Sequence, residues 1–246
     1  MKLYRVVLAT MLLVSAAARA ESAPVTLKKG DRIVFLGDSI TAQGGKPGGY
    51  VTLIKHSINA AHPDWGVEVI NAGISGNKVP NLQARLQKDV LDKKPTLVFI
   101  YIGINDVWHW RKNKDGGLAG GTPKDKFEAG LKDIIGRIQA AGARVVLCTA
   151  SVIGEKADGT NDRDQMLDEY CAISRKVAAE TKVTLVDLRK AFLDYLKTNN
   201  KENAPKGVLT RDEVHLNAAG NKFVAEQMLK VLGVQLVDVP AAPAKK

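Results

Sequence analysis

Short runs of β-branched and apolar residues alternate with longer helical patterns along most of this 246-residue chain. Five of these runs are four to seven residues long and too apolar for strands with one face in water. They are residues 32–36, 67–71, 96–102, 144–149 and 184–187. The helical patterns are at 49–61, 81–91, 124–141, 162–181, 188–198 and 218–232. The alternation predicts an α/β fold, a three-layer sandwich in which helices cover both faces of a five-stranded parallel sheet.

Helix boundaries and loops fit this arrangement. Pro123 starts one helical pattern, Gly142 ends it, and Asn217 is suited to cap the last helix. Two polar loops, 111–122 and 154–161, follow the carboxyl ends of predicted strands. Open α/β sheets place their ligands at those ends, so both loops are candidate rims of a site.

The first residues have the composition of an export signal. A short basic segment at residues 1–5 precedes an apolar run at 6–18, which is too short to span a membrane, and Ala18-Arg19-Ala20 resembles a signal-peptidase site. We predict a signal peptide at 1–20, a catalytic domain at 21–236 and a disordered tail at 237–246. The mature protein is then secreted or periplasmic and has no membrane span. An uncleaved membrane anchor is the alternative.

The chain is basic, with a formal net charge of +10, but its lysines are scattered apart from the terminal Lys245-Lys246. A basic surface favours anionic partners such as acidic polysaccharide or membrane. The scatter favours an ordinary soluble surface instead, and no nucleic-acid-binding motif is present. We therefore expect no nucleic-acid partner.

Two cysteines occur, Cys148 at the end of an apolar run and Cys171 within a helical pattern. Export makes a disulfide chemically permissible. Both positions also suit a small buried hydrophobic residue, and both interpretations stay open.

Ser39 follows the first predicted strand directly, on the turn that leads to the next helix. A serine hydroxyl needs a base within hydrogen-bonding reach, and the base needs a third group to orient it. His215 follows Asp212 by three residues just before the last helix, so the carboxylate can accept a proton from Nδ1 and leave Nε2 for Ser39. Alternatively, Asp212 merely precedes the helix cap and His215 is a surface residue.

Two further segments follow the second and third predicted strands. Gly73 lies in Asn-Ala-Gly, and Asn105 lies in Gly-Ile-Asn-Asp. Acyl transfer generates an oxyanion that needs fixed hydrogen-bond donors. Glycine allows close approach of a backbone N–H, and Asn105 supplies a side-chain amide. Each glycine taken alone is also consistent with a simple turn.

The four segments Gly-Asp-Ser, Asn-x-Gly, Gly-x-Asn-Asp and Asp-x-x-His occur in this order after successive strands. Together they resemble the block pattern of SGNH (GDSL) hydrolases, and the resemblance extends from Ile33 to Gly220. It departs from the pattern at Leu216, where many members have proline, and at Ile40, where the family name has leucine. Neither side chain is expected to take part in the reaction, so the two departures do not affect the proposed triad.

The resemblance implies a flavodoxin-like sheet of order 2-1-3-4-5 and ester hydrolysis without metal or organic cofactor. It assigns Ser39 as nucleophile, His215 as base and Asp212 as its orienting group. The oxyanion hole would consist of the N–H groups of Ser39 and Gly73 and the side chain of Asn105. Asp38 and Asp106 suggest a metal site, but each is better suited to hold a turn by accepting nearby backbone N–H groups.

Trp108 and Trp110 follow the third segment, where they could form a substrate rim by stacking on a sugar ring, or could pack beneath the glycine-rich loop. Together with export, they favour an esterase that removes small O-acyl groups, above all acetyl, from carbohydrate. A lysophospholipase or thioesterase with the same triad is the nearest alternative. A metallophosphoesterase is a further alternative, but the chain lacks the Asp-x-His and Gly-His-x-His motifs expected of that class. A non-catalytic carbohydrate-binding protein on a hydrolase scaffold is an alternative of another class, but it would not need these residues together.

Overall fold

The computed structural model describes residues 25–237 of the chain. The predicted signal peptide at 1–20 lies outside the described residues, as does the predicted tail at 237–246 except Val237. The N–H of Val237 donates to Ser57 Oγ at 3.0 Å. In the described part of the chain, no helix is long and apolar enough to cross a membrane.

The five predicted strands form one parallel sheet. They are β1 (Arg32–Gly37), β2 (Glu68–Gly73), β3 (Leu97–Tyr101), β6 (Arg144–Cys148) and β7 (Thr184–Val186). Their order is β2-β1-β3-β6-β7, which confirms the predicted order 2-1-3-4-5. Every residue of β3 is buried, as expected for a central strand covered on both faces.

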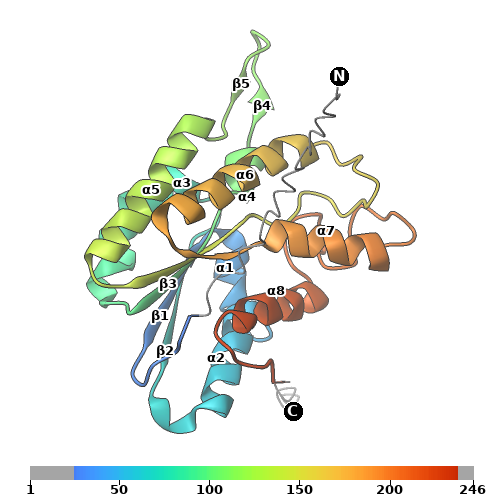
Figure 1. Ribbon diagram of the computed structural model, residues 1–246. Coiled ribbons are helices and arrows are strands. Elements are labelled where there is room, and N and C mark those ends of the chain that lie inside the picture. The colour runs from blue at the N-terminus through green and yellow to red at the C-terminus, as the bar shows by residue number, and fades with distance from the viewer. Residues whose placement is uncertain (1–24, 238–246) are drawn as a thin grey trace, which may run out of the picture.

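Helices cover both faces of this sheet, so the predicted three-layer sandwich is confirmed (Figure 1). One layer contains α3 (Val79–Asp89), α5 (Lys124–Ala140) and α6 (Asp164–Thr181). The other contains α2 (Tyr50–Ala61), α7 (Leu188–Asn199) and α8 (Ala218–Lys230). The short 3-10 helices η1 (Pro63–Trp65) and η2 (Leu91–Lys93) lie in the connections before β2 and β3.

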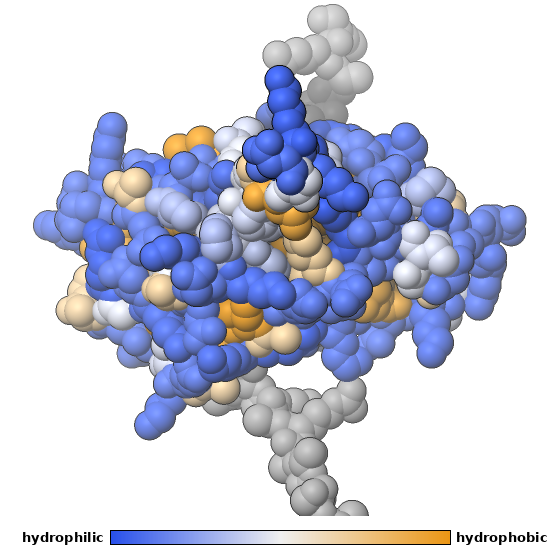
Figure 2. Space-filling view, turned by 90° about the horizontal axis from the view of Figure 1, so that it is seen from above, coloured by the Kyte–Doolittle hydropathy of each residue, from blue (hydrophilic) through white to orange (hydrophobic). Residues whose placement is uncertain are grey.

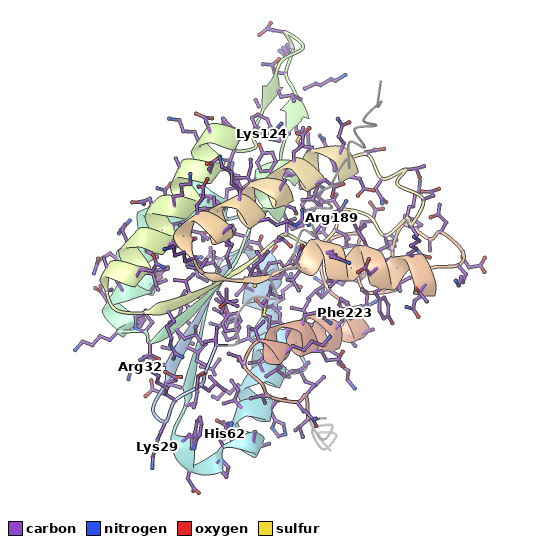
Figure 3. The ribbon with its side chains drawn as sticks, viewed as in Figure 1. Lys29, Arg32, His62, Lys124, Arg189 and Phe223 are labelled. Carbon is purple, nitrogen blue, oxygen red and sulfur yellow. The ribbon has the colours of Figure 1, made fainter. Side chains whose placement is uncertain are left out.

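Several short elements were not predicted. The helices α1 (Ser39–Gly44) and α4 (Ile104–Trp108) are six and five residues long, too short for a periodic pattern to reveal them. The loop predicted at 111–122 contains a hairpin of β4 (Arg111–Lys112) and β5 (Leu118–Ala119). The hairpin projects from the molecule at the top of Figure 1, while Arg32, at the start of β1, lies at the opposite end (Figure 3).

An ion cluster around a buried arginine joins the first turn of α7 to α6. Arg189 is 1% exposed, and its guanidinium group contacts Asp164 and Asp168 at 2.7 Å each (Figure 3). The backbone N–H of Arg189 donates to Thr149 Oγ1, just after β6. A buried guanidinium group is tolerated because carboxylates and carbonyls satisfy its donors, and the cluster ties the helix layers to the carboxyl end of the sheet.

Candidate active site

Ser39 is the first residue of α1 and follows β1 by a single residue. That residue, Asp38, caps the helix by accepting the N–H of Ile40 at 2.9 Å. Gly37 has no room for a side chain, because a Cβ would lie 2.5 Å from the carbonyl oxygen of Tyr101 on β3. The close packing of β1 on β3 thus holds the turn and places Ser39 at the carboxyl edge of the sheet.

Ser39, His215 and Asp212 are brought together as a hydrogen-bonded chain. Ser39 Oγ lies 2.9 Å from His215 Nε2, and His215 Nδ1 lies 2.9 Å from Asp212 Oδ2. The other carboxylate oxygen of Asp212 accepts the backbone N–H of His215 at 2.7 Å. Burial raises the pKa of Asp212, but the hydrogen bonds and charge of His215 outweigh it and bring the pKa below its usual value. Asp212 therefore stays ionised beside the imidazole, which suits a base that gains a proton.

A tight loop carries both Asp212 and His215. It is closed by a bridge between Thr210 and Leu216, and the N–H of Arg211 donates to the His215 carbonyl at 2.9 Å. Glu213, between the two site residues, has a positive φ of 77°, a left-handed conformation that costs energy for a non-glycine residue. The loop geometry thus aims carboxylate and imidazole to the same side.

Sequence reasoning missed Glu155, whose carboxylate holds the chain where this loop begins. Its side chain is fully buried and its carboxylate accepts the backbone N–H groups of Val208, Leu209 and Thr210. A buried carboxylate that accepts three N–H groups is well compensated for its loss of hydration. Glu155 lies in the polar segment 154–161, where nothing in the local pattern distinguishes it from a surface residue.

Gly73 is the last residue of β2 and Asn105 lies in α4, which follows β3, but each already has a hydrogen-bond acceptor. The Gly73 N–H donates to Asn71 Oδ1 at 2.9 Å, and Asn105 Nδ2 donates to the carbonyl of Asn77 at 3.1 Å. The amide of Asn105 retains a second hydrogen. Glycine is required at 73 because a Cβ would lie 2.1 Å from the backbone nitrogen of Ala42 in α1.

Arg85, on α3, is a second residue that sequence reasoning missed. Its guanidinium group donates to the carbonyl of Gly37 at 2.8 Å and to Asn77 Oδ1 at 2.7 Å, and it pairs with Asp89. Gly37 precedes the Ser39 turn, while Asn77 holds Asn105. One half-buried side chain therefore connects the serine turn to the amide donor, a long-range contact with no local sequence signal.

The carboxylates of Asp38 and Asp106 both accept hydrogen bonds from backbone N–H groups. Asp106 accepts the N–H of Val79 at the start of α3, at 3.0 Å, so it joins two segments instead of bracing only its own turn. Burial raises the pKa of Asp38 to about 7 and that of Asp106 to about 6. Between residues 25 and 237, no group of three or more His, Cys, Asp or Glu side chains is arranged to hold a metal ion.

The structure separates the two tryptophans. The Trp108 ring meets the His215 ring edge-on, with centroids 6.3 Å apart, and it lines a cavity of about 440 Å³. Trp110 instead packs under the hairpin, where its Nε1 donates to Tyr170 Oη at 3.3 Å and Gly121 lies against its indole. Trp108 thus lies at a cavity beside His215, whereas Trp110 has the packing role that was the alternative for both.

Cys148 and Cys171 are both buried and free in the structure. Burial raises the pKa of both thiols, that of Cys171 to about 12. Of the two interpretations left open by the sequence, the structure supports the second: each cysteine is a small buried residue without a disulfide bond.

Comparisons with known proteins agree with the predicted family and fold. Residues 35–223 match the model of the GDSL-like lipase/acylhydrolase family. The chain is 34% identical, over 227 residues, to an acetylxylan esterase of Geobacillus stearothermophilus, covering 85% of this chain and 96% of that protein. It is 28% identical over 202 residues to the esterase TesA of Pseudomonas aeruginosa, covering 81% of this chain and 87% of TesA.

Solved structures give the same result. The crystal structure of the acetyl xylan esterase AlAXEase has a TM-score of 0.75 and 44% identity, covering 81% of this chain and 98% of that one. A catalytic mutant of Axe2, an acetylxylan esterase from Geobacillus stearothermophilus, has a TM-score of 0.75 and 30% identity, covering 87% and 100%. The chain belongs to the GDSL-like lipase/acylhydrolase family and is a carboxylic ester hydrolase of the SGNH type.

Proposed function

We propose that the protein is a serine esterase that removes small O-acyl groups, chiefly acetyl, from carbohydrate. The observation that carries the proposal is the hydrogen-bonded chain from Ser39 Oγ through the imidazole of His215 to the carboxylate of Asp212. A serine at the carboxyl edge of a parallel sheet, with a base and an orienting acid in this order, is the arrangement of acyl-transfer catalysis.

The mechanism has two acyl-transfer steps. His215 Nε2 takes the proton of Ser39 as Oγ bonds to the ester carbonyl carbon, and the tetrahedral intermediate collapses as His215 protonates the departing sugar oxygen. A water molecule then loses a proton to His215 and attacks the acyl-enzyme. The second tetrahedral intermediate releases acetate, and the proton returns to Ser39.

The oxyanion of each intermediate would be bound by the N–H groups of Ser39 and Gly73 and by the free hydrogen of the Asn105 amide. The hydrogen bond to the carbonyl of Asn77 holds this amide in place. The Gly73 N–H contributes only when its bond to Asn71 is shared with the oxyanion. Such fixed donors typically supply a large part of the rate acceleration.

Two observations support an acetylated carbohydrate as the substrate. Relatives at 34% and 44% identity are named as acetylxylan esterases. In addition, polar and charged side chains predominate around the cavity beside His215, which suits sugar hydroxyls better than the long acyl chain of a lysophospholipid. We also propose that residues 1–20 direct export and are removed, which N-terminal sequencing of the secreted protein would test.

The test is hydrolysis of p-nitrophenyl acetate, p-nitrophenyl octanoate and acetylated xylo-oligosaccharide by purified protein with chelator present. We expect hydrolysis of the acetyl esters, loss of activity in Ser39→Ala and full activity in Ser75→Ala, a matched change at an exposed serine. Preference for octanoate would favour the lysophospholipase alternative. Equal inactivity of parent and Ser39→Ala on all esters would favour a carbohydrate-binding protein.

Trp108 is proposed as the surface on which a sugar ring stacks. Trp108→Ala should raise KM for acetylated oligosaccharide and leave turnover of p-nitrophenyl acetate nearly unchanged. Trp110→Ala provides the comparison, because this side chain packs under the hairpin. An unchanged KM in Trp108→Ala would rule out the stacking role.

A further inference from the structure

The cavity of about 440 Å³ beside the proposed triad has an unusual set of charges in its lining. Trp108 and Glu213 place it next to the triad, because the first contacts His215 and the second lies between Asp212 and His215. Arg111, Lys156 and Arg163 also line it, from the hairpin, the segment after β6 and the start of α6. The face of the molecule that carries the hairpin is predominantly hydrophilic (Figure 2).

Two of these cations converge on a single backbone oxygen. Arg111 Nη1 and Arg163 Nη2 each donate to the carbonyl of Trp110 at 2.9 Å, and Arg111 also donates to the carbonyl of Trp108. Within residues 25–237, neither guanidinium group forms an ion pair with a carboxylate. Two positive groups held this close repel each other, and an anion bound between them would relieve that repulsion.

The side chains that line the cavity include three cations and two carboxylates, so positive charge predominates. Burial and the charges of Lys78 and Arg111 lower the pKa of His109, which follows Trp108 directly, and so favour its neutral form. Asp162 and Glu213 line the same cavity, but both are exposed, and in the part of the chain that the structure describes neither forms an ion pair with the three cations. The cationic side chains therefore retain donors for a ligand.

We infer that this cavity binds the carboxylate of a uronic acid unit, so that the enzyme favours acetyl esters on acidic oligosaccharides. The inference rests on the proposed function and names the substrate class of that site. A guanidinium group presents parallel N–H donors that match the two oxygens of a carboxylate. The volume lies within the range of ordinary ligand pockets, and Trp108 supplies an apolar surface for the sugar ring.

The experiment compares an acetylated xylo-oligosaccharide carrying one glucuronic acid with its carboxyl-reduced counterpart, which carries acetyl groups at the same positions and none on the new hydroxyl. We expect kcat/KM to be about fivefold higher for the acidic compound at low salt, a size typical of a few partly exposed charge contacts. In ~1 M NaCl, where the screening length is roughly 3 Å, the preference should nearly vanish.

Replacing two cavity residues of opposite charge distinguishes a loss of carboxylate recognition from general damage to the fold. Lys156→Gln should reduce the preference, because the carboxylate of the ligand would lose a cationic partner. Asp162→Asn should increase the preference, because a carboxylate that repels the ligand is removed. Lys112→Gln removes a charge from the same hairpin outside the cavity and should leave the preference unchanged.

Calorimetric titration of the two oligosaccharides into Ser39→Ala makes the inference independent of catalysis. Tighter binding of the acidic compound supports the inference even if the parent hydrolyses no ester, in which case only the proposed function fails. Equal binding of the acidic and reduced compounds overturns the inference and leaves the esterase proposal intact. A preference that is the same in Lys156→Gln, Asp162→Asn and the parent would also overturn it.

Discussion

The side-chain amide of Asn105 donates a hydrogen bond to the backbone carbonyl of Asn77 at 3.1 Å. This bond fixes the amide at the carboxyl end of β3, 3% exposed, with a second hydrogen still to donate. We predict that Asn105→Ala lowers kcat by about 10²–10³-fold, because a fixed donor to the oxyanion is lost. Steady-state hydrolysis of p-nitrophenyl acetate measures this. Asn199→Ala, at the exposed end of α7, should retain parental turnover, and an unchanged kcat in Asn105→Ala would remove that residue from the site.

Arg85 joins the carbonyl of Gly37 to the side chain of Asn77, so its loss should disturb the serine turn and the amide donor together. We predict that Arg85→Lys lowers kcat by roughly 10- to 100-fold with little change in KM, because a displacement of the reacting groups is costly. Kinetics on acetyl esters with circular dichroism checks this. Lys88→Ala, on the exposed side of the same helix, is the control. A rise in KM alone would contradict the positioning role.

Glu155 accepts three backbone N–H groups of the segment that leads to Asp212 and His215. Glu155→Ala should lower the free energy of unfolding by roughly 3 kcal/mol, since buried donors lose a charged acceptor. It should also lower kcat, because the loop is no longer anchored. Urea denaturation and ester hydrolysis measure the two effects. Glu202→Ala, at an exposed position, should change neither, and parental stability in Glu155→Ala would refute the anchoring role.

The buried carboxyl of Asp38 predicts a specific dependence of stability on pH. Its pKa is raised by burial to about 7 in the folded protein, from about 3.8 in the unfolded chain. Between these values the folded protein holds a proton that the unfolded chain has released, so this group reduces stability as pH rises from about 4 to about 7.

Asp38→Asn cannot ionise and should remove this dependence. Relative to the parent, its free energy of unfolding should increase across that window by roughly 4 kcal/mol and stay constant above it. Denaturant titrations at a series of pH values measure the difference. Asp64→Asn, near the surface at η1, is the control, and parallel pH profiles for Asp38→Asn and the parent would contradict a raised pKa.

Local sequence pattern determined the strands, the longer helices and the ends of several elements. The five apolar runs correspond to the five sheet strands, and Asn217 caps α8 by accepting the N–H of Gly220, because strand propensity and capping depend on neighbouring residues. The pairing of Asp212 with His215 was also predictable, since only three residues separate them. The family resemblance added the sheet order, which composition and periodicity do not contain.

Tertiary structure alone decided the contacts between residues far apart in the chain. Ser39 and His215 are 176 residues apart, and their hydrogen bond depends on the order of the strands and the path of the last loop. The contacts of Arg85 and Glu155 and the different surroundings of Trp108 and Trp110 depend on the same features. Loops have no hydrophobic period and short helices contain too few residues to show one, so local sequence cannot reveal where their side chains lie. Burial and hydrogen bonding across the folded chain decide that.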